Sequence, residues 1–212
     1  MIIQWFGHSY FKIETKNSVI AIDPYHEEIT QIKPPRFKAD ILLISHNHLG
    51  HNNKNAILGE PFILENPGEI EKNGIFIYGI PSFHDNKNGK ERGFNTIFTI
   101  ESEDIIVCHL GDLGEKMLKE ETVEKLSNVD ILLIPVGGYS TINAENAIDI
   151  INQIEPKIVI PMHYRFNNKS KLDPLDKFLK TFGKKPENLD KLVIRKSQIP
   201  TTDTSLIVLN IK

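Results

Sequence analysis

The stretch Ser45-His46-Asn47-His48-Leu49-Gly50-His51 places three histidines within six residues, directly after a strand predicted over residues 41–45. A continuous apolar run of this length is typical of a strand buried on both faces, and loops after such strands often carry function. Residues two apart in extended chain point to the same side. We therefore expect His46 and His48 to present both imidazoles to one metal ion. The alternative is a surface loop that happens to be rich in histidine.

Three further potential ligands also follow predicted strands. His84 follows residues 75–80, Asp112 follows residues 105–108, and His163 follows residues 157–160. A lone histidine is more often a core or surface residue with an ordinary hydrogen bond than a ligand. The strands of one sheet, however, deliver their ends to the same edge, so their shared position favours a common site.

The remaining chain indicates an α/β protein. Short strands are predicted over residues 2–6, 10–14, 19–22, 62–64, 75–80, 96–100 and 105–108, the first three as an antiparallel meander. The second half alternates helices at 115–126, 144–154 and 174–181 with strands at 131–134, 157–160, 191–195 and 205–211, and Asn143 is a predicted N-cap. We expect two facing sheets with helices outside, in one domain over residues 1–212.

The composition, net charge and cysteine count exclude several classes of protein. The 212 residues are 40% hydrophobic and 25% charged, which fits a globular protein, and the net charge of −3 provides no bulk field for nucleic acid or an anionic membrane. Cys108 is the single cysteine, so neither an intramolecular disulfide nor a thiolate zinc finger can form. No apolar run approaches the about 18 residues of a membrane span, and we expect a cytoplasmic protein.

The order and content of these motifs resemble those of the metallo-β-lactamase superfamily of metal-dependent hydrolases. The closer likeness is to its branch similar to L-ascorbate-6-phosphate lactonase and N-acyl-phosphatidylethanolamine phospholipase D. The resemblance rests on Ile22-Asp23-Pro24, residues 46–51, Pro81-Ser82-Phe83-His84-Asp85, Asn95-Thr96, His109-Leu110-Gly111-Asp112, Leu133-Ile134-Pro135-Val136-Gly137-Gly138 and Ile160-Pro161-Met162-His163-Tyr164. It implies a four-layer αββα sandwich of two mixed sheets, with the site at one edge.

The resemblance also implies the roles of individual residues. His46, His48 and His84 would form a first metal site, His51 and His163 would serve a second, and Asp112 would bridge the two; Asp112 and His163 are also the expected catalytic residues. Asp23 would orient a ligand histidine, although a strand-ending turn is the plainer interpretation of Asp23-Pro24. His109, His8 and His26 match no ligand position, and we expect His8 and His26 to be structural or exposed. These ligands suit one or two zinc ions but also accept manganese, iron or nickel.

Gly50 departs from the histidine motif of this superfamily. The family motif is HxHxDH, and glycine stands here where the motif has aspartate. Glycine cannot ligate through a side chain, so the second site would keep Asp112, His51 and His163, with water as the replacement and a weaker second metal. Because a carboxylate there can also orient the attacking water, the chemical step is affected as well.

The expected function is hydrolysis of an ester, lactone or phosphodiester of a small molecule by metal-bound hydroxide. The alternative is a non-catalytic relative that binds a metal or ligand, and a nucleic-acid-processing role is disfavoured by the acidic balance. An anionic substrate would suit the basic residues that follow His84 and His163, for which solvated loop charge is the plainer interpretation. They are Lys87, Lys90, Arg92, Arg165 and Lys169. Tyr139 and Tyr164 would either line the pocket or pack.

Overall fold

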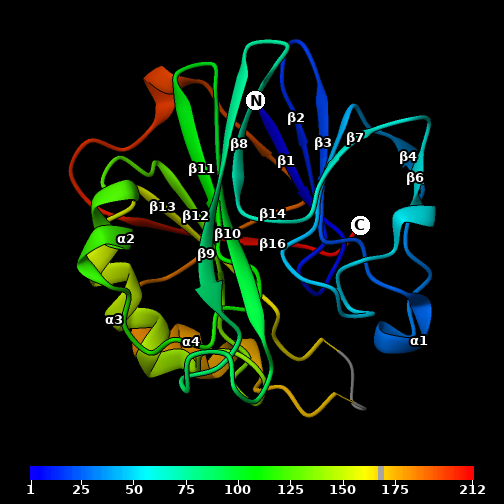
Figure 1. Cartoon of the computed structure of the whole chain (residues 1–212). Helices are drawn as coiled ribbons and strands as arrows, with labels where there is room; N and C mark the ends of the chain where they lie inside the picture. Colours follow the sequence, from blue (N-terminus) through cyan, green and yellow to red (C-terminus); the bar gives the residue numbers. More distant parts are fainter. Residues whose placement is uncertain (167–169) are drawn as a thin grey trace.

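Two mixed β-sheets pack face to face in the computed structural model, which describes residues 1–166 and 170–212 (Figure 1). The six-stranded sheet has the order β15-β1-β2-β3-β5-β7, and the eight-stranded sheet has the order β14-β16-β13-β12-β11-β10-β9-β8. A two-stranded ladder joins β4 (Phe37–Lys38) to β6 (Ile57–Leu58).

The six-stranded sheet begins as the predicted antiparallel meander. Its strands are β1 (Ile2–Trp5), β2 (Phe11–Glu14), β3 (Val19–Ile22), β5 (Ile41–Leu43), β7 (Phe62–Leu64) and β15 (Leu192–Val193). The strands β3, β5 and β7 run parallel to one another. Every residue of β5 is buried because Ile41 and Leu43 face the main core while Leu42 faces a second apolar cluster on the outer side. A strand covered on both faces explains the continuous apolar run before His46.

The eight-stranded sheet is built on long hairpins followed by parallel strands. Its members are β8 (Gly68–Lys72), β9 (Ile75–Phe83), β10 (Phe94–Ser102), β11 (Ile105–His109), β12 (Ile131–Pro135), β13 (Ile158–Met162), β14 (Glu187–Leu189) and β16 (Ser205–Leu209). The pairs from β8 to β11 are antiparallel and those from β11 to β16 are parallel. The ends of β11 and β13 therefore lie at the same edge, as predicted.

The helices are distributed unequally between the two outer layers. The helices α2 (Glu120–Lys125), α3 (Ala144–Ile154) and α4 (Leu175–Phe182) lie on one side of the molecule in Figure 1, and α1 (Glu27–Thr30) lies with β4 and β6 on the other. Short 3₁₀ turns occupy Lys54–Ala56 and Lys196–Gln198. The expected sandwich with helices outside is confirmed, and the outer layer over the six-stranded sheet is mostly loop and the β4–β6 ladder.

One predicted helix is shorter than its sequence pattern. Residues 115–119 are not helical, since Phe83 N donates to the Glu115 carboxylate at 2.9 Å and Leu118 N donates to Gln153 Oε1 at 2.9 Å. These tertiary bonds replace the first helical turn. The predicted cap of α3 is confirmed, because Asn146 N donates to the Asn143 side chain at 2.9 Å.

The longest described helix, α3, has 11 residues, and within the described ranges no helix combines the length and apolarity that crossing a bilayer requires.

Candidate metal centre

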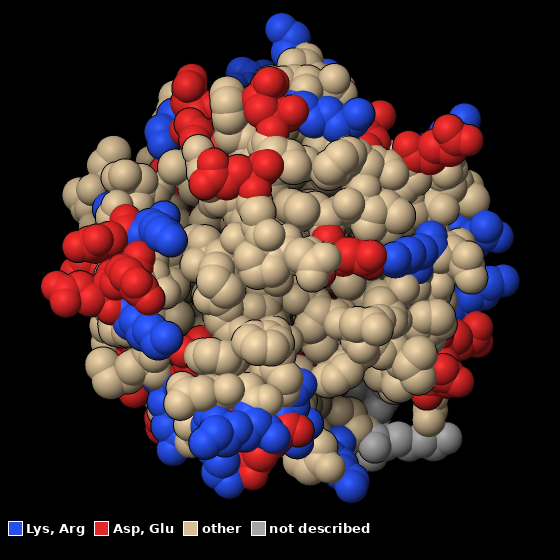
Figure 2. Space-filling view, viewed as in Figure 1, with Lys and Arg blue, Asp and Glu red and all other residues tan. Residues whose placement is uncertain are grey.

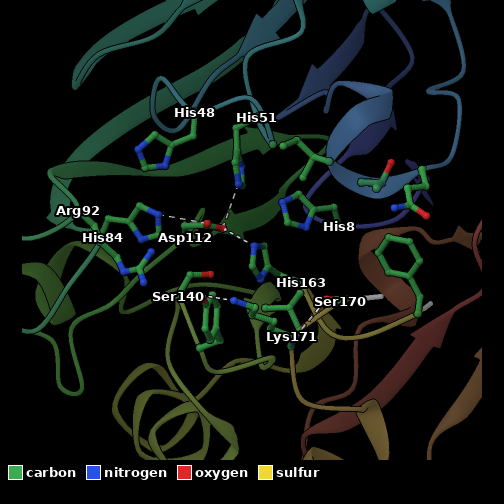
Figure 3. A pocket seen from close by; sticks show the side chains of 17 residues that line it. His8, His48, His51, His84, Arg92, Asp112, Ser140, His163, Ser170 and Lys171 are labelled. Carbon is green, nitrogen blue, oxygen red and sulfur yellow. Dashed lines mark hydrogen bonds and ion pairs between the residues drawn. The ribbon is translucent and has the colours of Figure 1, made fainter. Parts of the chain in front are cut away.

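The predicted ligands meet where the two sheets present strand ends to each other (Figure 3). His46, His48 and His51 follow β5 of the six-stranded sheet. His84, Asp112 and His163 follow β9, β11 and β13 of the eight-stranded sheet. Each sheet thus contributes three of the six predicted ligands, and the structure brings all six together.

The histidine cluster is a tight turn and does not continue the strand. His48 N donates to His46 O, and both His51 N and Asn52 N donate to His48 O at 2.9 and 3.1 Å. The reasoning from strand alternation was therefore wrong for His46 and His48. The turn nevertheless brings their rings to a centroid distance of 4.5 Å.

Asp112 lies at the centre of the cluster and is buried. Its Oδ1 is 3.2 Å from Nε2 of His51 and 3.3 Å from Nε2 of His163. Its Oδ2 is 3.4 Å from Nε2 of His84 and 3.9 Å from Nε2 of His46. One carboxylate oxygen therefore faces each half of the site.

The imidazoles form two groups around this carboxylate, which His46 and His51 link because they also form a group with Asp112. In each group, one ligand atom per residue lies within 4.8 Å of the others: His46, His48 and His84 form one group, and His8, His51 and His163 form the other. Each group has the three-nitrogen donor set that zinc prefers, with the Asp112 oxygens as a fourth donor.

Asp23 fixes the tautomers of two of these histidines. Nδ1 of His51 donates to Asp23 Oδ2 at 2.8 Å, and the Ser45 hydroxyl donates to the same oxygen at 2.6 Å. Because that hydroxyl hydrogen is committed, Nδ1 of His46 donates to Ser45 Oγ at 3.0 Å. Nε2 is therefore the nitrogen that each of these imidazoles has available for a cation. A simple strand-ending turn would not require this network.

The protonation states follow from burial and charge. Burial lowers the pKa of His46 and of His8, and it lowers the pKa of His84 to about 4. Burial opposes the charged form of His51 as well, but the carboxylates of Asp112 and Asp23 outweigh it and raise the pKa of His51 to about 10. Burial likewise opposes ionisation of Asp112, and the neighbouring His163 and His51 reverse this and hold its pKa well below the usual range.

The donor atoms fit a bound cation. Among the described residues, Nε2 of His46 and Oδ1 of Asp112 are buried and have no hydrogen-bond partner. Buried polar atoms without a partner are costly, and a cation in each half of the site would satisfy one of these two atoms. Carboxylate and imidazole donors around one centre are also the ligands that divalent transition metals take.

His8 is the residue that the sequence did not place here. It is 8% exposed, and its ring centroid lies 4.0 Å from that of His163 and 5.0 Å from that of His51. It follows β1, so a lone histidine in a hairpin turn gave no signal of its own. His26 lies outside the cavity. His109 is buried with Nε2 donating to Ser9 O and Nδ1 accepting from Gly111 N, which leaves no lone pair for a metal.

A cavity of about 340 Å³ opens above the cluster. Arg92 and Lys171 lie at its wall with Tyr139, whose ring is 5.9 Å from the Arg92 guanidinium and 5.4 Å from Lys171 Nζ. Of the basic residues named from the sequence, Arg92 reaches the cavity, whereas Lys87 pairs with Glu91, and Lys90 and Arg165 do not line it. Lys169 lies outside the described residues. Tyr164 is buried against Trp5, away from the cavity.

The chain belongs to the beta-lactamase superfamily, whose domain model matches residues 2–163. A UPF0173 metal-dependent hydrolase of Thermoplasma acidophilum is 30% identical over 198 residues, covering 81% of this chain and 87% of that protein. A UPF0173 protein of Pyrococcus abyssi is 30% identical over 182 residues, covering 77% and 83%.

Among solved structures, a Thermotoga maritima protein of the metallo-beta-lactamase superfamily superposes with a TM-score of 0.81 at 34% identity, covering 98% of this chain and 97% of that one. The resemblance to the metallo-β-lactamase superfamily and the expected fold are therefore confirmed. The likeness to the lactonase branch stays a prediction.

Proposed function

We propose that this chain is a metal-dependent hydrolase that holds one or two divalent cations at the cluster and cleaves an ester, lactone or phosphodiester of a small molecule. The position of the buried Asp112 carries the proposal, because one of its oxygens faces His51 and His163 and the other faces His84 and His46. The proposal also agrees with the relatives, which include proteins named metal-dependent hydrolases.

In this proposal His46, His48 and His84 would hold one cation, His51 and His163 would hold a second, and Asp112 would serve both. Zinc suits this set best, with manganese, iron and nickel as alternatives. Bound cations of this kind lower the pKa of a coordinated water toward about 7, which supplies a nucleophile at neutral pH.

The chain's own residues have separate tasks. Asp112 and His163 line the floor of the cavity and would contact the attacked group, so they are the proposed catalytic residues. Asp23 does not reach the cavity and would act by holding His51 and, through Ser45, His46 in the required tautomers.

The proposed substrate carries a negative charge. Arg92 and Lys171 approach the cavity from two sides, and a cavity of about 340 Å³ matches a small molecule. A phosphate or carboxylate between these side chains would accept charge-assisted hydrogen bonds from both.

The surface charge fits a nucleic-acid substrate less well than a small molecule. Figure 2 shows acidic and basic side chains interspersed around the rim of one face, with an uncharged area in its middle. Together with the net charge of −3, this arrangement favours a small substrate over a polyanion.

The test combines metal analysis with hydrolysis. Protein equilibrated with zinc is analysed by plasma mass spectrometry and assayed on bis(p-nitrophenyl) phosphate, a δ-lactone and p-nitrophenyl acetate. We expect bound zinc and hydrolysis of at least one compound, both lost in the double variant His46→Ala, His48→Ala. Unchanged metal content and activity in that variant would overturn the proposal. Bound zinc without any hydrolysis would favour the non-catalytic alternative.

Substrate charge has its own test. Arg92→Gln and Lys171→Gln should each raise KM for an anionic substrate, by up to about fivefold for such exposed pairs, and leave a neutral ester unaffected. Arg165→Gln, an exposed arginine outside the cavity, is the matched control.

A further inference from the structure

Gly50 and His8 compete for the same space on the floor of the cavity. A Cβ built on Gly50 would lie 2.6 Å from Nε2 of His8 and 3.2 Å from its Cδ2. The first distance is far inside van der Waals contact, where packed carbon atoms lie about 3.5 to 4.0 Å apart. The position where a side chain of residue 50 would begin is therefore filled by the imidazole of His8.

The imidazole of His8 also faces the second group of potential ligands. A ring nitrogen of His8 lies within 4.8 Å of ligand atoms of His51 and His163, and both of those residues contact Asp112 Oδ1. In Figure 3 the His8 ring lies beside His51 and His163, on their side of Asp112. The His8 side chain is largely enclosed in this position, since the residue is 8% exposed.

We infer that His8 supplies, through Nε2, the ligand that the motif aspartate would have supplied at position 50. The second cation is then held by His8, His51, His163 and Asp112, and no water is needed to complete it. This inference rests on the proposed function, because it requires that the cluster bind a second cation.

The backbone holds His8 firmly in this place. Its carbonyl accepts hydrogen bonds from Trp5 Nε1 at 3.0 Å and from His163 N at 2.9 Å. Its φ is 53°, in the left-handed region that residues other than glycine rarely adopt. Backbone strain of this kind persists where the surroundings impose it, and it is concentrated at functional sites. The bond from His163 N ties His8 directly to another proposed ligand.

The competing explanation is that His8 only fills the volume vacated by the aspartate. The two explanations differ in what they require of the ring. A filler needs the shape of an imidazole, whereas a ligand needs its nitrogen lone pair. Exchange of a carboxylate for an imidazole also shifts a site from cations that prefer oxygen, such as manganese, toward zinc and cobalt.

The experiment therefore replaces the imidazole of His8 by a flat ring that has no nitrogen. Zinc binding is measured by equilibrium dialysis with plasma mass spectrometry, and cobalt(II) binding by its visible absorption. We compare the wild type with His8→Phe and with the control His26→Phe, a histidine outside the cavity. We expect two cations in the wild type and control, and for His8→Phe a loss of about 100-fold or more in affinity for the second, since even outer partners of ligands contribute 10- to 100-fold.

A second set of variants covers the case in which His8→Phe fails to fold. Gly50→Asp alone should not strengthen the second site, because the new side chain meets the His8 ring. His8→Ala should lose the second cation. The double variant His8→Ala, Gly50→Asp should regain it, with relative affinity shifted toward manganese.

The outcomes separate this inference from the proposed function. Two cations with equal affinity in the wild type and His8→Phe would overturn the inference and leave the two-cation proposal intact. One cation in the wild type would overturn the inference and leave a hydrolase with a single cation, whereas no cation at all would overturn both. Failure of Gly50→Asp to restore the site in the His8→Ala background would also count against the exchange of ligands.

Discussion

Nδ1 of His51 and Oδ2 of Asp23 lie 2.8 Å apart, and the same oxygen accepts a hydrogen bond from Ser45, which links it to His46. A single buried carboxylate therefore sets the tautomers of one histidine in each proposed metal group. Ser45 N also donates to Asp23 Oδ1 at 2.7 Å, so the carboxylate fixes the start of the histidine turn as well.

Asp23→Asn should weaken both metal groups. An asparagine has one accepting oxygen, so its NH2 group must face either Ser45 N or the pair formed by His51 Nδ1 and the Ser45 hydroxyl, and one part of the network is lost. We expect metal affinity to fall about 10- to 100-fold and the free energy of unfolding to fall by about 1–3 kcal/mol. Zinc titration and urea unfolding measure the two effects. Asp40→Asn is the control, because Asp40 also accepts a backbone hydrogen bond, from Val19 N, but lies far from the cluster in the fold. Equal metal affinity in the two variants would contradict the role given to Asp23.

Asn95→Ala should displace Asp112. The Asn95 amide donates to Ser82 Oγ and Leu110 O, and its oxygen accepts from Asp112 N at 2.9 Å. Alanine leaves these buried groups without partners, so we expect a loss of about 2–4 kcal/mol in the free energy of unfolding and weaker binding of both cations. Asn210→Ala, which removes an exposed bond to Asp190, should change neither quantity measurably.

Removal of metal should destabilise the fold. Without a cation, Nε2 of His46 and Oδ1 of Asp112 are buried without hydrogen-bond partners among the described residues. Zinc at a hundredfold excess over its Kd should add about 2.7 kcal/mol to the free energy of unfolding per site. Calorimetry before and after dialysis against dipicolinate gives the shift in Tm. A Tm that does not respond to the chelator or to added zinc would show that the cluster holds no cation.

Low pH should abolish the contribution of Asp85 to the stability of the folded state. Burial opposes ionisation of this carboxyl, but backbone N–H groups of Arg92, Lys87, Glu91 and Gly89 donate to it and lower its pKa to about 2. A depressed pKa stabilises the folded state above the unfolded value, about 3.9, and this stabilisation is lost as pH falls from there toward 2.

Asp85→Asn should therefore lower the free energy of unfolding by about 1–2 kcal/mol at neutral pH. The difference from the wild type should shrink between pH 4 and pH 2, which chemical unfolding at several pH values measures. The exposed Asp203→Asn provides the matched charge change. A difference that stayed constant with pH would assign the effect to packing and not to the charge.

Local signals predicted the strand ends and the residues after them. The buried run before His46 and the position of Asp112 after β11 depend on adjacent residues, and both were readable from the sequence. The non-helical conformation of residues 115–119 could not be predicted in this way, because Glu115 and Leu118 form hydrogen bonds to segments that are distant in sequence.

His8 could not be found for a related reason. It follows β1 as a lone histidine, about 40 residues from the turn it joins, and no local pattern marks it. The one signal was Gly50, which showed that a ligand was missing but not which side chain takes its place. That answer depends on the packing of the two sheets.

The cluster draws its residues from both sheets, with His8, Asp23 and the histidine turn on one and His84, Asp112 and His163 on the other. It is complete only after the two sheets have docked, so a bound cation joins two layers that have no covalent cross-link. We expect such a cation-bound connection to form after the folding transition state. Metal loading should therefore slow unfolding far more than it accelerates refolding, which makes the resting lifetime of the fold depend on metal supply.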